Sequence, residues 1–120
     1  MSANANTEQF AEVAFIMADV LRIKKEFTQA ERELRQNVKK MSNHPHWVAK
    51  SLILLSDIYL ELGNLSQAKA TLKSVIDHHD GPELVALAQE RYQHILNLEQ
   101  EKNRVQDVQS EELNLEPNGQ

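Results

Sequence analysis

A pattern of core-type residues that recurs 38 positions later is the feature that most restricts the fold of this 120-residue chain. Four residues of the first half have apolar counterparts in the second half. The pairs are Leu21 and Tyr59, Phe27 and Leu65, Ala30 and Ala68, and Leu34 and Leu72. Because a period of about 20–50 residues is typical of repeated supersecondary units, the pattern predicts that one unit occurs twice.

Residues that begin or end helices predict that this unit is a helical hairpin. Helix starts are indicated by the capping pairs Asn6 with Gln9 and Thr28 with Glu31, by Pro45 in a first turn, by Ser66 as a cap, and by Gly81-Pro82. Gly63 indicates a helix end. We therefore expect helices near 7–24, 28–41, 45–62, 66–79 and 82–103. With only three Gly and three Pro in the chain, the fold class is predicted to be all-α.

The two ends of the chain lack the apolar residues that a packed domain needs. Residues 1–6 are polar, and residues 104–120 carry only four large apolar side chains among acidic ones: Val105, Val108, Leu113 and Leu115. We therefore expect both ends to be disordered and the folded domain to cover residues 7–103. The N-terminus does not resemble a secretory signal, and no apolar run is long enough to cross a bilayer, so no membrane insertion is expected.

The charge balance and the absence of cysteine exclude several classes of function. Thirteen Lys and Arg stand against eighteen Asp and Glu, and a net charge of −5 argues against a nucleic-acid partner. With no Cys there is no thiol nucleophile, disulfide or Cys-ligated zinc. No nucleophile–base pair or Gly-rich phosphate loop is recognisable either, so we expect no enzyme, no catalytic residue and no cofactor.

The repeated unit resembles the tetratricopeptide repeat, most clearly in the second copy. The residues that carry the resemblance are Leu52, Leu55, Tyr59, Gly63, Leu65, Ala68, Leu72 and Val75. The first copy keeps Ala14, Met17, Ala18, Leu21, Phe27, Ala30 and Leu34, but has Lys25 where the family prefers Gly. The resemblance implies repeats at about 10–41 and 45–79, a capping helix at about 82–103, and a right-handed α-solenoid fragment.

The resemblance also implies a function and a setting. Residues 44–70 look similar to the C-terminal end of large tetratricopeptide-repeat proteins of Gram-negative cell envelopes, which suggests a scaffold component. In this family the first helix of each repeat lines a concave groove that holds a protein or peptide segment. The matching positions are Glu12, Phe15, Asp19, Arg22 and Ile23 in the first copy, and Lys50, Ile53, Asp57, Leu60 and Glu61 in the second.

The apolar and acidic residues among these ten predict the chemistry of the partner. Some members of the family hold a terminal carboxylate with Lys and Asn, but the corresponding places here are Phe15, Asp19, Ile53 and Asp57. We therefore expect no carboxylate clamp, and instead an amphipathic segment with basic residues. The alternative is that these positions form only a solvated stripe.

Two other functions stay open at this point. The helix near 10–23 is apolar in more directions than one neighbour can cover, which suggests a homodimer through those residues. A histidine metal-binding domain is less favoured, because His44 with His46, and His78 with His79 and Asp80, lack the spacing of a specific zinc site. We read these histidines as residues at helix ends and expect no metal.

Overall fold

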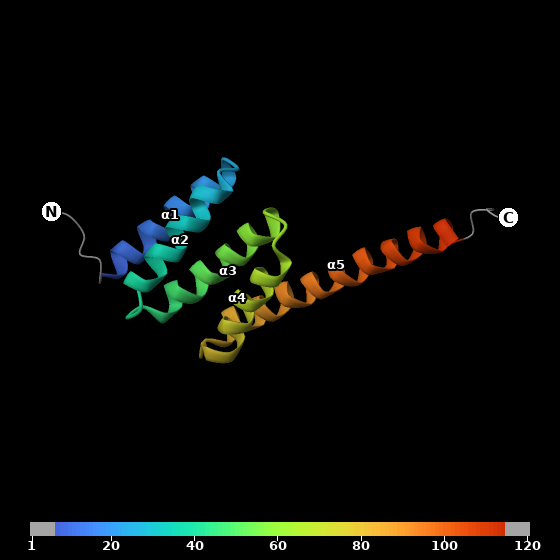
Figure 1. Ribbon diagram of the computed structural model, residues 1–120. Coiled ribbons are helices and arrows are strands. Elements are labelled where there is room, and N and C mark those ends of the chain that lie inside the picture. Colours follow the sequence, from blue (N-terminus) through green and yellow to red (C-terminus); the bar gives the residue numbers. More distant parts are fainter. Residues whose placement is uncertain (1–6, 115–120) are drawn as a thin grey trace.

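The computed structural model describes residues 7–114, which form five consecutive α-helices (Figure 1). The helices are α1 (Glu8–Ile23), α2 (Phe27–Lys40), α3 (Pro45–Glu61), α4 (Leu65–His78) and α5 (Pro82–Asn114). No strand occurs within this described part, so the predicted all-α class is confirmed. The expectation of disorder at residues 1–6, and at residues 115–120 of the C-terminal tail, falls outside the described residues.

The backbone repeats the 38-residue period of the sequence at the turns of its two hairpins. Lys25 and Gly63 both adopt left-handed φ angles, of 65° and 78°. In the first turn the N–H of Glu26 donates to the carbonyl of Leu21, and in the second the N–H of Asn64 donates to the carbonyl of Tyr59, each at 2.8 Å. Since such bonds satisfy the last carbonyls of a helix, one turn design closes both α1–α2 and α3–α4.

Small residues at the helix crossings organise the core. Ala30 of α2 and Ala68 of α4 are completely buried, and each lies one helical turn before a buried leucine, Leu34 or Leu72. The helix α3 is central, because α1, α2, α4 and α5 all pack against it. Tyr59 of α3 joins this core and donates a hydrogen bond from its hydroxyl to Glu31 of α2 at 3.2 Å.

The helix ends differ from the sequence prediction at three caps. Thr7 caps α1 by accepting from the N–H of Phe10, whereas the predicted cap, Asn6, lies outside the described residues. Asn64, not Ser66, caps α4 by accepting from the N–H of Gln67. Thr28 lies inside α2, because the turn at Lys25 already starts that helix at Phe27.

The largest difference is at the C-terminus, where α5 continues to Asn114 instead of ending near residue 103. Between Glu83 and Asn114 there is neither Gly nor Pro, and Glu101 forms an ion pair with Arg104 one turn later. Helix propensity and such local pairs extend the helix without tertiary packing. Residues 101–112 are all exposed, and this half of α5 projects from the other helices (Figure 1).

None of the helices in the described part combines the length and hydrophobicity needed to cross a membrane.

Candidate partner-binding groove

A surface groove runs along the faces of α1, α3 and α5. It consists of two adjoining clefts that share Arg22, Asp57 and Arg91. The first cleft, of about 330 Å³, is lined by Phe15, Asp19, Arg22, Lys50, Ile53, Leu54, Asp57, Leu84, Leu87 and Arg91. The second, of about 280 Å³, is lined by Arg22, Asp57, Leu60, Glu61, Arg91 and His94. We call these thirteen residues the groove.

The floor of the groove is apolar and held in place by the core. Ile53 and Leu54 are buried in α3, and Leu84 and Leu87 of α5 pack against the same core cluster. Because these side chains lie on two helices, α3 and α5, and pack against one core, the floor is preformed. A preformed apolar floor with a few polar groups at its edge is typical of sites that bind a side chain or a segment of another molecule.

Three acidic and three basic residues surround this floor and partly neutralise one another. Arg22 pairs with Asp19 on the same helix at 2.8 Å. Arg91 of α5 lies 3.4 Å from Asp57 of α3, measured from Nε to Oδ1. That Nε atom is buried and makes no hydrogen bond within residues 7–114, so the Arg91–Asp57 pair is the less complete of the two.

An aromatic cluster holds the remaining cation at one end of the groove. The Lys50 ammonium lies 4.9 Å from the ring centroid of Phe15 and 5.0 Å from that of Trp47. The two rings pack against each other at 5.8 Å, and Trp47 Nε1 donates to a Glu8 carboxylate oxygen at 3.4 Å. Contacts of a cation with aromatic faces orient Lys50 as well as stabilising it.

Asp57 is the titratable group of the groove whose surroundings most affect it. Burial raises the pKa of Asp57, and the nearby carboxylates of Glu61 and Asp19 raise it further. Arg91 and Arg22 lower the pKa, but burial is the largest effect. The two arginines therefore do not fully offset the hydration that the Asp57 carboxylate loses on folding.

The structure brings eight of the ten sequence-predicted site residues into the groove: Phe15, Asp19, Arg22, Lys50, Ile53, Asp57, Leu60 and Glu61. Glu12 and Ile23 are exposed and do not line either cleft. They lie at the border of the groove face of α1, because the five predicted positions of α1 span a wider arc of the helix than the cleft, which takes only Phe15, Asp19 and Arg22.

Sequence reasoning missed the contribution of α5. Leu84, Leu87, Arg91 and His94 follow one another at spacings of three and four residues, which places them on one helix face. That periodicity was visible in the sequence. Arg91 also changes the charge of the site, since it balances an acidic residue that the sequence analysis treated as free to attract a basic partner.

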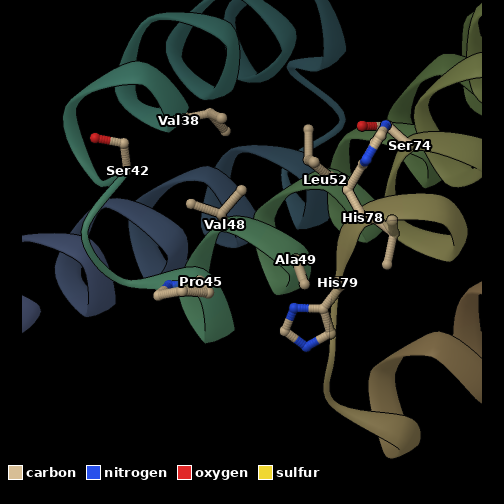
Figure 2. Close-up of a pocket in the computed structure, with 10 residues that line it drawn as sticks. Val38, Ser42, Pro45, Val48, Ala49, Leu52, Ser74, His78 and His79 are labelled. Carbon is tan, nitrogen blue, oxygen red and sulfur yellow. The ribbon is translucent and has the colours of Figure 1, made fainter.

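A further cleft, separate from the groove, lies among α2, α3 and α4 (Figure 2). It was not predicted from the sequence. It measures about 300 Å³ and is mainly apolar, with Val38, Val48 and Leu52 in its lining and His78 and His79 at one edge. Gly81 lies next to the His79 ring: a Cβ on Gly81 would be 2.7 Å from Nε2 of His79, so the ring would have to move.

The histidines do not gather into a metal site in the described part of the chain. No cluster of three or more His, Cys, Asp or Glu side chains suited to a metal ion occurs there. His78 and His79 lie at the end of α4, and His46 stacks edge-on against Trp47 at 5.3 Å. The groove thus offers apolar contacts and ion pairs as its chemistry.

Comparisons of the chain with models of known protein families, with curated protein sequences and with solved structures find no match.

Proposed function

We propose that the chain is a non-catalytic protein-interaction module that holds an amphipathic peptide or helical segment of a protein partner in the groove. One observation carries the proposal: α3 and α5 place leucine and isoleucine side chains in a preformed floor, with Phe15 of α1 in the same cleft, beside the desolvated Asp57 carboxylate. Burial of an apolar partner face supplies affinity in such a site, while the charges at the edge select its orientation.

In this proposal the two hairpins are tetratricopeptide-type repeats and the first part of α5 is their capping helix. The shared turn geometry and the shared 38-residue spacing of Ala30 and Ala68 support it. The exposed polar side chains on the outer side of α5, such as Gln89, Glu90 and Gln93, suit a helix that ends a stack. A place as a terminal element of a cell-envelope scaffold follows from the resemblance alone.

The charges define where a basic residue of the partner would sit. Asp19 already has a close pair with Arg22, whereas Asp57 and Glu61 lie together near the less complete pair with Arg91. A partner lysine or arginine placed between Asp57 and Glu61 would compensate the desolvated carboxylate. The partner chemistry is thus an apolar helical face with one basic residue at its edge, not a strongly basic segment.

A library of amphipathic 16-residue peptides, each with one Lys on its polar border, provides the probe. Peptides selected on the parent chain are measured by fluorescence anisotropy on Leu87→Glu and on Ala86→Glu. Leu87 lines the groove and Ala86 is exposed outside it. We expect Leu87→Glu to weaken binding at least about tenfold, because it puts a charge into the apolar floor, and Ala86→Glu to leave binding unchanged. Equal binding to both variants would exclude the groove as the site.

The pH dependence of the same binding tests the role of Asp57. A partner cation stabilises the ionised carboxylate and lowers its pKa, so affinity should rise as the pH increases through the Asp57 pKa. Asp57→Asn should abolish this rise, while Asp19→Asn, which affects an already paired group, should keep it. A pH profile that is the same in the parent and in Asp57→Asn would show that the partner cation binds elsewhere.

A further inference from the structure

The side of α1 that faces away from the core carries an apolar surface. It consists of Val13, Ile16, Met17, Val20 and Ile23, whose exposed fractions lie between 46% and 64%. Each of them lies three or four residues from another member of the set, which places them on one face of α1. We call this face the outer stripe. The outer stripe is distinct from the groove, since none of its five residues lines either groove cleft.

The 38-residue repeat shows how the same face is used in the second hairpin. The α3 counterparts of Val13, Ile16, Met17 and Val20 are Ser51, Leu54, Leu55 and Ile58, and each is at most 5% exposed. The fifth pair is the exception: Glu61, the counterpart of Ile23, is exposed, as Ile23 is. A face that is buried in α3 is therefore open in α1.

The preceding hairpin covers this face of α3. Both α1 and α2 pack against α3, and Ser51 Oγ donates a hydrogen bond to Sδ of Met41, at the end of α2, at 3.6 Å. Next to this face, the Tyr59 hydroxyl reaches Glu31 of α2. The element that fits on the N-terminal side of a helix in this fold is thus a helical hairpin, with its second helix in contact with the covered face.

We propose that the outer stripe is a docking surface for a helical hairpin of the same kind, which would seat on α1 as α1–α2 seats on α3. This goes beyond the groove function and uses a different face. A second copy of the chain does not supply such a hairpin, because the covering surface of its own α1–α2 is occupied by its α3. The partner is therefore a separate hairpin unit whose covering surface is free, apolar and without a charge at its centre.

A tandem chain provides the probe. Residues 7–44 are placed once more directly before residue 7, which keeps the 38-residue register, so the added hairpin precedes α1 as α1–α2 precedes α3. In the added copy, Ile16→Glu, Met17→Gln and Val20→Glu make its own outer stripe polar. We expect a melting midpoint about 5–10 °C above that of the parent and loss of most of the fluorescence of an apolar-surface dye.

Two matched variants decide the result. Ile16→Glu with Val20→Glu in the original α1 should abolish the gain in midpoint. The midpoint is the readout for this variant, because the substitutions themselves remove the apolar surface that the dye detects. A version whose original α1 carries the α3 residues, through Val13→Ser, Ile16→Leu, Met17→Leu and Val20→Ile, checks that the tandem architecture can dock. If only this version is stabilised, or if no version gains over the parent, the outer stripe is not a hairpin seat.

The parent chain gives a second, independent readout by light scattering at about 10 μM with the same dye. A monomer whose dye fluorescence disappears in Ile16→Glu with Val20→Glu supports an open docking surface. A dimer that these substitutions convert to a monomer would overturn the proposal, because a second copy would then be the occupant. A monomer without dye fluorescence would overturn it too. The groove-binding peptides should bind normally in all these variants, so failure here does not affect the proposed function.

Discussion

The two hairpins have the same turn, yet their first helices are in different surroundings. The helix α3 has neighbours on several sides and buries eight of its residues, whereas α1 buries only three alanines. Both helices are nevertheless apolar in sequence, so composition alone does not reveal which one is enclosed. What differs is the packing around each helix: the first hairpin covers one side of α3, and no described residue covers the equivalent side of α1.

A pair of matched truncations, Leu55→Ala in α3 and Met17→Ala in α1, tests this difference most directly. The two positions are 38 residues apart, but Leu55 is 4% exposed and Met17 is 56% exposed. Leu55→Ala should lower the free energy of unfolding by about 2–5 kcal/mol, because it leaves a cavity. Met17→Ala should change it by about 0.5 kcal/mol or less. Urea denaturation measures both, and similar losses would mean that the outer stripe of α1 is also covered.

A second pair concerns the close helix crossings. Ala68→Leu should cost about 1–3 kcal/mol, because Ala68 is completely buried between α3 and α4 and those helices are held on both sides. Ala30→Leu should cost less, since the α1–α2 hairpin has a neighbour on only one side and can move apart. Ala70→Leu is the control, because Ala70 is exposed on the same helix as Ala68. If Ala68→Leu melts like Ala70→Leu, the assigned crossing is wrong.

Much of this fold could be predicted from the sequence because its signals are local. The 38-residue period and the positions of Pro45, Gly63 and Pro82 predict five helices, and each helix of the structure begins within one residue of the expected position. Eight of the ten predicted groove residues lie together because a helical face follows directly from residue spacing. The order of the helices then brings the matching faces of α1 and α3 to one side.

The rest depended on contacts between distant residues or on weak local preferences. That Arg91 pairs with Asp57 requires knowing how α5 crosses α3, which no local pattern contains. The end of α5 was misjudged because a lack of apolar residues predicts a lack of packing, and packing is not needed for a helix without Gly or Pro. The caps moved by one or two residues because Thr7 and Asn64 are also good capping residues.

The turns of the two hairpins can be compared by two reciprocal substitutions, Gly63→Ala and Lys25→Gly. Gly63 and Lys25 share a left-handed backbone conformation. A Cβ on Gly63 would meet no atom within 4 Å, so the cost of a side chain there comes from backbone strain and not from a clash. Gly63→Ala should lower the free energy of unfolding by about 1 kcal/mol. Lys25→Gly should raise it by a few tenths of a kcal/mol, because relief of strain is partly offset by the greater freedom of unfolded glycine. Thermal melts of both variants measure this, and a loss of stability in Lys25→Gly would show that its side chain matters more than its backbone.

The smallest effect is expected at the far end of α5, which is a helix without a neighbour. Deleting residues 106–120 should leave the melting midpoint unchanged within about 1 °C, since residues 101–112 bury no side chain. The circular dichroism signal at 222 nm should still fall, because helical residues are removed. A deletion that starts at Ile95 is the contrast: it removes a side chain that is 2% exposed and the Lys69–Glu99 ion pair between α4 and α5, and it should lower the midpoint by many degrees. If the shorter deletion lowers the midpoint by several degrees, the end of α5 contacts another part of the molecule. The two faces to examine are then the groove and the outer stripe. Repeating the deletion in Leu87→Glu and in Ile16→Glu would show which of them is involved.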